Sequence, residues 1–283
     1  IPEFDKFKRV LRIPQPFEIR VNNIKSDFSE VKRILRDRGY DPQPRCWNAN
    51  FITVETNPSK TLEHWLGKFY IQEFVSGIPP RALAPKPEER VLDMCAAPGS
   101  KTGQIAAMMG NEGEVLANDR RADRTRSLLS NLYRLGVVNV QVTERDGRNL
   151  PESPKFDKIL VDVPCSGEGN ARRDEELRSG ADQKRINDLP GLQRQLLEKA
   201  FDVCADGGMI VYSTCTFAPE ENELVVSDFL DRGELVDLTF DFPHSIGIRE
   251  WNGERFDKEI EKCVRVYPHQ VDSGGVFVAK FQK

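Results

Sequence analysis

The sequence predicts an α/β fold, in which a mostly parallel sheet carries helices on both faces and follows a small α+β unit. From residue 90 onward, short apolar runs alternate with helical segments, and this alternation is typical of right-handed βαβ units. A charged segment with two prolines, APKPEE at 84–89, separates that part of the chain from the part before it. We therefore predict two units, residues 1–83 and residues 84–283, which suits a length of 283 residues.

The first unit is predicted to contain two strands and one main helix. Residues 17–23 alternate apolar and polar side chains, as a half-buried strand does. Residues 28–40 place apolar side chains at helical spacing, and Gly39 is suited to end that helix. Residues 42–56 are predicted to form a turn and then a strand. Residues 64–83 are predicted to form a connector with one or two helical turns.

The second unit is predicted to contain five strands with helices between them. Strands are expected at residues 90–96, 114–119, 137–146, 155–165 and 207–217, and helices at residues 101–110 and 121–137. In a parallel sheet of this kind, ligands bind beyond the carboxyl ends of the strands. Functional side chains are therefore expected at those ends.

The composition argues against several classes of protein. With 39% hydrophobic and 30% charged residues, the chain can form a core and is too charged for a membrane protein. It has no run of about 18 apolar residues and no charged-then-apolar leader, so we expect a cytoplasmic location. Six cysteines without a CxxC pair and only three histidines argue against a disulfide scaffold, a Ser-His-Asp centre and any metal site. Cys46, Cys204 and Cys263 are expected to be core residues.

The loop after the first of these five strands is suited to bind a ligand through its backbone. Its small residues allow close approach, and the helix that follows offers unpaired N–H groups. The loop matches neither GxGxxG nor GxxxxGK[ST], which argues against a loop that grips phosphates. The candidate ligand-binding residues are Cys95, Ala96, Ala97, Pro98, Gly99, Ser100 and Lys101.

Acidic residues end the next three predicted strands. Asp119 lies twenty residues after Gly99, a spacing typical of an acid that binds ribose hydroxyls, and Asp146 and Asp162 follow. Each acid taken singly is better explained as a helix cap or a loop residue. Together with Asp93 they suit a ligand that has a ribose, an amino group and a positive charge but no diphosphate. S-Adenosylmethionine, a sulfonium cation, is such a ligand.

Two cysteines are predicted to meet beside this site. Cys165 follows Asp162 and Pro164 at one strand end, and Cys215 follows Thr214 at the neighbouring strand end. A lone cysteine in an apolar strand is usually a small core residue. Beside a methyl donor, however, a thiolate that adds to C6 of a pyrimidine would allow C5 to take up a methyl group. The residues therefore favour methylation of carbon, on a base that is unstacked to reach the pocket.

Three motifs in this order resemble the Nol/Nop/Sun family of RNA cytosine-5 methyltransferases, the Sun/Fmu relatives. The motifs are VLDMCAAPGSKT at 91–102, VDVPCSGEG at 161–169 and YSTCTFAPEENE at 212–223. The resemblance extends from about residue 17 to the end of the chain. It implies a Rossmann-like class I methyltransferase fold with a mostly parallel seven-stranded sheet, and S-adenosylmethionine as the methyl donor.

The resemblance also implies roles for individual residues. Cys215 matches the nucleophile that attacks C6, and Cys165 matches a second cysteine that assists product release. Asp162 matches the acid that contacts the target cytosine, with Lys101 beside it. Cys95 through Lys101 match the donor-binding loop. The other implied donor contacts are Asp119 for the ribose, Arg124 near it, Asp146 near the adenine, and Asp162.

RNA is the partner that the resemblance implies. Residues 1–45 contain eleven basic and seven acidic side chains, a balance of +4, which on charge alone describes an ordinary solvated face. The resemblance makes Lys32, Arg33 and Arg36 candidate phosphate contacts within an RNA-binding first unit. Arg172 and Arg173 follow the Pro-Cys motif and are further candidates, although a solvated loop explains them equally well.

Within RNA, transfer RNA is favoured over ribosomal RNA because the chain is short and shows no added module. We expect a monomer. The alternatives are a ribosomal RNA methyltransferase of the same chemistry and a largely non-catalytic RNA-binding protein of the same fold. A small-molecule methyltransferase would leave the first unit and the paired cysteines unexplained. One departure from the family motif is the segment from Asp272 to Phe277, where Ser273 and Val276 replace the usual threonine and phenylalanine.

Overall fold

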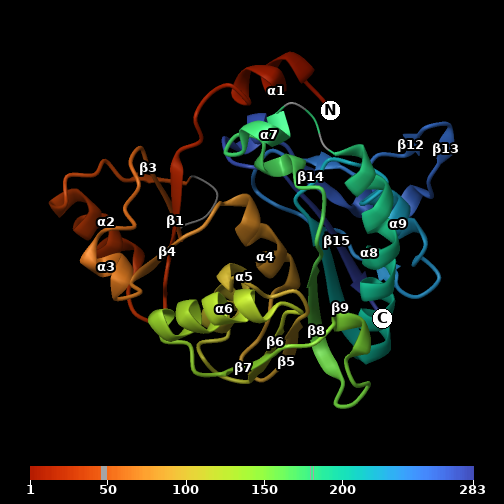
Figure 1. The fold of residues 1–283 in the computed structure, drawn as a ribbon, viewed down its shortest axis with the longest axis horizontal. Coiled ribbons are helices and arrows are strands. Elements are labelled where there is room, and N and C mark those ends of the chain that lie inside the picture. The colour runs from red at the N-terminus through yellow and green to blue at the C-terminus, as the bar shows by residue number, and fades with distance from the viewer. Residues whose placement is uncertain (46–49, 179, 181) are drawn as a thin grey trace.

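The computed structural model describes residues 1–45, 50–178, 180 and 182–283. It contains a small antiparallel sheet at the N-terminal side and a large sheet formed by the rest of the chain (Figure 1). Cys46, which we expected in the core, lies outside the described residues. Within the described part of the chain, no helix is long and apolar enough to cross a membrane.

The small sheet has the strand order β2–β3–β1–β4, and all its pairs are antiparallel. Helix α2 begins at Asp27, whose side chain accepts a hydrogen bond from the backbone of Glu30, and it buries Val31, Ile34 and Leu35 against the sheet. The elements of this part are α1 (Phe4–Val10), β1 (Phe17–Val21), α2 (Phe28–Asp37), β2 (Gln43–Pro44), β3 (Phe51–Val54), α3 (Leu62–Trp65) and β4 (Phe69–Ile71).

The connector contains more regular structure than predicted. Strand β4 pairs with β1, and the chain then forms η1 (Val75–Gly77) and α4 (Ile78–Leu83). Helix α4 packs against β8, β9 and β15 of the large sheet, although it precedes the predicted boundary at residue 84. The division of the chain at that point stays a prediction.

The large sheet has the order β11–β14–β15–β9–β8–β5–β6–β7, and β10 pairs with the edge of β15. Strands β7, β6, β5, β8 and β9 are parallel to their neighbours, and β15 is inserted antiparallel between β9 and β14. Its main strands are β5 (Arg90–Asp93), β6 (Glu114–Asn118), β7 (Val140–Thr143), β8 (Phe156–Asp162), β9 (Cys204–Thr214), β14 (Val264–Val266) and β15 (Val276–Gln282). The sheet is mostly parallel, as the resemblance implied, but within the described residues it has nine strands instead of seven because the two-residue strands β10 and β11 pair with β15 and β14.

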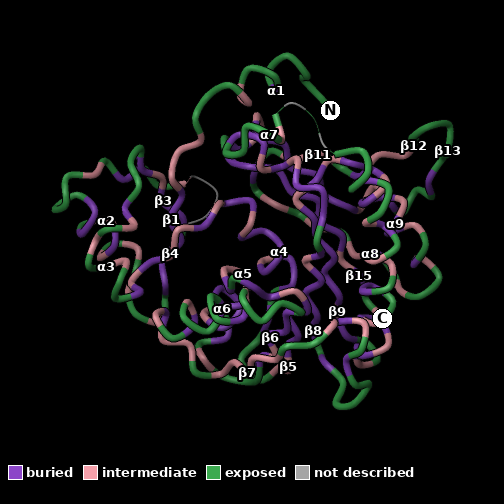
Figure 2. The backbone as a smooth tube through the Cα atoms, in the orientation of Figure 1, coloured by how far each residue is buried: buried purple, intermediate pink, exposed green. Residues whose placement is uncertain are grey.

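The remaining elements surround this sheet. They are α5 (Ser100–Met108), α6 (Ala122–Leu135), η2 (Gly147–Asn149), η3 (Glu168–Asn170), α7 (Glu175–Arg178), α8 (Gln183–Val203), α9 (Glu223–Ser227), β10 (Glu234–Leu235), β11 (Ser245–Ile246), β12 (Glu250–Trp251), β13 (Glu254–Arg255), η4 (Lys258–Lys262) and α10 (Pro268–Val271). Helices α4, α5 and α6 lie on one side of the sheet and α8 on the other, and the strands between them are mostly buried (Figures 1 and 2).

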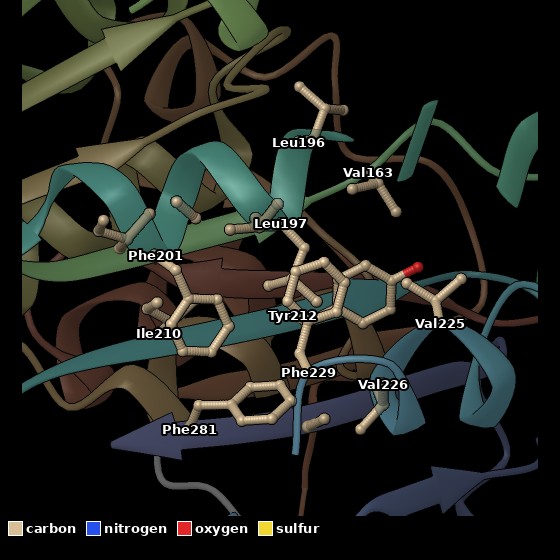
Figure 3. Packing of buried hydrophobic residues seen from close by; sticks show 14 of the residues in the cluster. Val163, Leu196, Leu197, Phe201, Ile210, Tyr212, Val225, Val226, Phe229 and Phe281 are labelled. Atoms are coloured by element: carbon tan, nitrogen blue, oxygen red, sulfur yellow. The ribbon is translucent and has the colours of Figure 1, made fainter. Parts of the chain in front are cut away.

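The largest core cluster lies between α8 and the sheet. Phe201 of α8 contacts the rings of Phe229 and Phe281, with centroids 5.7 and 5.3 Å apart (Figure 3). Cys204 and Cys263 belong to this cluster and are fully buried, which confirms their assignment as core residues. This packing fixes α8 against β9 and so fixes the loops at the carboxyl ends of β8 and β9.

The two units are joined by polar contacts. Glu18 of β1 is fully buried, pairs with Arg45 at 2.5 Å and accepts a hydrogen bond from Ser273 at 2.6 Å. Arg45 also donates to the backbone carbonyls of Val271 and Asp272. The small sheet is therefore tied to the loop that enters β15.

Candidate active site

Cys165 and Cys215 lie side by side where β8 and β9 end. The parallel register pairs Asp162 with Ser213, so the chain leaves both strands at the same level. The two sulfur atoms are 3.1 Å apart, and the backbone N–H of Cys215 also donates to the Cys165 sulfur at 3.3 Å. The predicted convergence of the two cysteines is thus present in the structure.

The proton shared by these thiols is held by Cys165. The hydrogen bond from Cys165 lowers the pKa of Cys215, and burial opposes this shift without reversing it. The same hydrogen bond, together with burial, raises the pKa of Cys165. Cys215 is therefore the thiol that ionises more readily, as a nucleophile must.

An ion pair stands beside the Cys215 sulfur. Lys101, near the start of α5, contacts the Asp162 carboxylate at 2.7 Å. Burial disfavours the charged form of Lys101, but the Asp162 carboxylate outweighs burial and raises the pKa of the lysine. The hydroxyl of Ser213 donates to the other Asp162 oxygen at 2.7 Å. Both oxygens of Asp162 are thus held in fixed directions.

Polar contacts lock the two cysteine loops together. The Ser166 and Thr216 hydroxyls are 2.6 Å apart, and Thr216 also donates to Glu168 at 2.7 Å. Glu221, whose pKa is raised by burial, accepts from the Ser166 backbone and from Gln193. Four residues in or next to these loops were not predicted as site residues from the sequence: Ser213, Glu168, Glu221 and Asn170. The sequence feature that could have identified them is their position inside or next to the two cysteine motifs.

The loop predicted to bind the donor lies between β5 and α5, as expected from the sequence. Asp119, almost fully buried, accepts a hydrogen bond from the Ala97 backbone at 3.2 Å and pairs with Arg124 at 3.3 Å. Arg124 also donates to the Ala97 carbonyl. Gly99 has φ 101°, and a Cβ at this position would come within 2.7 Å of the Leu128 side chain. The loop therefore follows the surface of α6 closely and presents its backbone to the strand ends.

Of the predicted donor residues, Asp146 differs from its expected position, whereas Cys95 lies in the loop as predicted. Asp146 lies beyond β7, where it caps η2 instead of ending the strand. The hydrogen bond from Arg148 lowers the pKa of Asp146 to about 2, so this carboxylate is ionised at neutral pH. Cys95 lies within the loop, and burial raises the pKa of its thiol, which makes it unsuited to be a nucleophile.

These residues border three adjoining cavities. We name them outer, middle and inner by their order in the series from Asp146 to Tyr70. The outer cavity, of about 390 Å³, is bordered by Cys95, Asp119, Arg124, Asp146, Pro164 and Leu192. The middle cavity, of about 300 Å³, is bordered by Cys95, Arg124, Asp162, Cys165, Asn170 and Cys215. The inner cavity, of about 280 Å³, is bordered by Tyr70, Glu73, Lys101, Asp162, Asn170 and Cys215. Because neighbouring cavities share residues, the acids and the paired cysteines face one continuous space.

The outer and middle cavities fit S-adenosylmethionine. Two ionised or buried acids, Asp119 and Asp146, stand beside the apolar side chains of Leu189 and Leu192. This combination suits a ligand with a polar ribose and an apolar purine face, and the volume suits a small molecule. The middle cavity carries Asp162, whose carboxylate favours a positively charged group.

Arg172 does not fit its expected role as an RNA contact. Its side chain is fully buried and donates to the carbonyls of Ile13 and Pro14, and it pairs with Asp272 at 2.8 Å. All of these contacts bring distant parts of the sequence together, which the local sequence does not reveal. The structure therefore corrects this prediction, and Arg172 is a buried tie between the N-terminal segment and the loop before β15.

The other predicted RNA contacts lie at or near the surface. Arg173 is half exposed and pairs with Glu73 of the inner cavity at 2.9 Å. On α2, Lys32 lies over the Phe28 ring, Arg33 pairs with Asp37 at 3.1 Å, and Arg36 is exposed. Helix α2 lies at the left edge of Figure 1, apart from β8 and β9. The α2 residues are thus separate from the cysteine site, and their role stays a prediction.

Comparison with known proteins identifies the family. The family model described as 16S rRNA methyltransferase RsmB/F matches residues 80–282. A tRNA (cytosine(49)-C(5))-methyltransferase of Pyrococcus abyssi is 34% identical over all of this chain and 93% of the relative. The chain belongs to the RsmB/F family. This result confirms the resemblance to the Nol/Nop/Sun enzymes.

Other members of the RsmB/F family differ in length. A 28S rRNA (cytosine-C(5))-methyltransferase of Mus musculus is 36% identical over 100% of this chain, but the chain spans only 37% of that relative. The crystal structure of NSun6 from Pyrococcus horikoshii with SFG, an analogue of S-adenosylmethionine, superimposes with a TM-score of 0.85. That match has 25% identity and covers 99% of this chain and 94% of the other. It confirms the Rossmann-like methyltransferase fold of this RsmB/F chain.

Proposed function

We propose that this chain is an S-adenosylmethionine-dependent RNA (cytosine-5)-methyltransferase that acts through a covalent bond between Cys215 and C6 of cytosine. One observation carries the proposal: two thiols 3.1 Å apart border the middle cavity, and one of them, Cys215, also borders the inner cavity. A methyltransferase that acts on nitrogen or oxygen has no use for such a pair. Membership of the RsmB/F family supports the same chemistry.

S-Adenosylmethionine, when bound, supplies a methyl group on a positively charged sulfur. The residues that would hold it are the loop Cys95–Lys101 together with Asp119 and Asp146, which border the outer cavity or adjoin it. The target cytosine would enter the inner cavity. There the fixed carboxylate of Asp162 and the ammonium of Lys101 would orient the ring through its polar edge.

Cys215 then forms the S–C6 bond as a thiolate, and the electrons of the C5–C6 double bond move toward C5. The electron-rich C5 would take the methyl group as the bond from that group to the donor sulfur breaks. Water would then take the C5 proton as the S–C6 bond breaks, which restores the aromatic ring and the thiolate. Cys165, which keeps its proton beside Cys215, is suited to assist this release. The two cysteines thus serve different halves of one reaction.

Transfer RNA is the substrate that we favour within this proposal. The P. abyssi relative, whose name gives tRNA as its substrate, has nearly the same length as this chain. The mouse relative, whose name gives 28S rRNA, is much longer. Ribosomal RNA is the alternative, since the family model carries that name.

The test is methyl transfer to fractionated RNA. The protein is incubated with isotopically labelled S-adenosylmethionine and either transfer or ribosomal RNA, and the RNA is then digested to nucleosides. We expect label in 5-methylcytidine from transfer RNA, and none with a Cys215→Ala variant that still binds RNA. Label from ribosomal RNA alone would show that ribosomal RNA, and not transfer RNA, is the substrate. Label in another nucleoside would overturn the two-cysteine mechanism. Absence of label, with donor binding retained, would favour the non-catalytic alternative.

A further inference from the structure

No carboxylate, lysine or histidine of the described residues hydrogen-bonds to the Cys215 sulfur, although the Asp162–Lys101 pair lies beside it. Within the described part of the chain, two side chains hydrogen-bond to this sulfur: Cys165 at 3.1 Å and the amide nitrogen of Asn170 at 3.4 Å. Cys165 keeps its own proton, and an amide neither gains nor loses one at neutral pH. Asn170 is therefore a permanent neutral donor directed at the reacting sulfur.

Asn170 is held in place by the backbone of η3. The N–H of Gly169 donates to the Cys215 carbonyl at 2.7 Å, and the carbonyl of Gly169 accepts from Gly275 at 3.0 Å. A Cβ at Gly169 would come within 2.4 Å of the Gly275 carbonyl, so this close approach requires glycine. The Asn170 carbonyl accepts from the backbone of Arg173 at 2.8 Å. The Asn170 side chain thus projects from a fixed backbone at a fixed distance from Cys215.

The position of Asn170 between two cavities also matters. Asn170 and Cys215 both border the middle cavity and the inner cavity. Lys101 already places one positive charge beside this sulfur, and Asp162 balances it. A further cationic side chain at position 170 would have no such partner and would repel a positively charged methyl donor nearby. An amide stabilises the thiolate through a hydrogen bond alone. A neutral donor therefore suits a thiolate that must share its space with a sulfonium.

We propose that Asn170 is a positioning residue for the reaction: its side-chain amide stabilises the ionised sulfur of Cys215 and holds it at the entrance to the inner cavity. This inference rests on the proposed function for its biological meaning. The contact itself exists without RNA or donor, so it is testable in their absence. The closest comparison is Asn170→Asp, which keeps the shape of the side chain but replaces the amide donor with a carboxylate.

The experiment measures alkylation of Cys215 by iodoacetamide between pH 6 and about pH 10, with peptide mass spectrometry to follow this cysteine separately from the others. In Asn170→Ala, loss of one hydrogen bond to the thiolate should slow alkylation of Cys215 near neutral pH by about threefold to tenfold. The pH at which alkylation reaches half its maximal rate should move upward. In Asn170→Asp, we expect an equal or larger shift because a like charge replaces the donor. Asn139→Ala, which loses an amide contact to Glu112 at the other end of the sheet, should match the wild type.

The outcomes separate this inference from the proposed function. An upward shift in both Asn170 variants supports the inference, even if the wild type methylates no RNA. An unshifted midpoint in both variants would overturn it, even if the wild type produces 5-methylcytidine. Circular dichroism identifies a variant that has not folded. If Asn170→Ala has not folded, the test rests on Asn170→Asp, which preserves side-chain volume. An upward shift of its pH midpoint then supports the inference, and an unshifted midpoint overturns it.

Discussion

At the scale of single residues, the two neighbouring thiols differ because their shared hydrogen bond lowers the pKa of Cys215 and raises the pKa of Cys165. Cys165→Ala removes the thiol beside Cys215 without removing the nucleophile. We expect this variant to attack RNA but to release it slowly, so that a protein–RNA adduct accumulates on denaturing gels. The double variant with Cys215→Ala should form no adduct. Normal turnover by Cys165→Ala without an adduct would contradict the release role.

Asp119 is the residue whose replacement should weaken donor binding most directly. It is buried, supports the Ala97 backbone and pairs with Arg124. Asp119→Asn keeps its shape but removes the charge, and one or two lost charge-assisted hydrogen bonds should cost roughly 2–4 kcal/mol of S-adenosylmethionine binding. Calorimetry measures this affinity. Asp123→Asn, an exposed acid one turn away, is the control, and equal affinities in both variants would refute the assignment.

The residues of the site divide into those that a sequence reveals and those that it does not. Cys165, Cys215 and Asp162 were predictable because a parallel sheet brings the ends of neighbouring strands to one edge. Burial of Arg172 was not predictable, because its partners Ile13 and Asp272 come from opposite ends of the chain. The sequence around Arg172 does not show which distant segments it contacts in the folded chain.

At the scale of elements, helix α5 offers a matched pair of glycines. Gly99 precedes the helix with φ 101° and packs against Leu128, whereas Gly110 follows it with φ 66° and has no atom near its missing Cβ. Both Gly→Ala changes should cost about 1 kcal/mol for the backbone conformation. Only Gly99→Ala should cost more and also weaken donor binding. Urea denaturation and calorimetry test this, and equal effects at both positions would contradict the close-packing argument.

The elements that the sequence prediction missed include a long helix, α8 with 21 residues, and the seven-residue strand β15. The others are short and depend on distant contacts. Helix α1 has only seven residues, and its buried residue, Phe7, packs against the rings of Phe217 and Tyr267. Strand β4 has three residues and exists because β1 offers an edge for pairing. Long segments such as α2 and α6 were predicted because a full turn-by-turn repeat of apolar residues is visible locally.

At the scale of the whole molecule, we propose that the small sheet holds RNA while the large sheet performs the chemistry. Buried contacts of Glu18 with Arg45 and Ser273 fix the small sheet to the loop before β15, and Gly275 of that loop borders the inner cavity. A phosphate backbone bound at α2 would thus be held in a constant relation to Cys215. Binding and catalysis should accordingly be separable by mutation.

Lys32 and Arg36 on α2 test this separation. Arg33 is a poorer choice, since Asp37 pairs with it. Lys32→Glu combined with Arg36→Glu should weaken RNA binding about tenfold at low salt and reduce the slope of log affinity against log salt by about 1.5, because two phosphate contacts are lost.

Donor affinity should not change in this double variant, since α2 is separate from the outer cavity. The matched control is Arg255→Glu with Lys258→Glu, which makes the same change in net charge at two exposed positions in the acidic part of the chain. If both double variants weakened RNA binding equally, overall charge would explain the effect. Unchanged binding in the α2 variant would move the RNA contact to another face of the molecule.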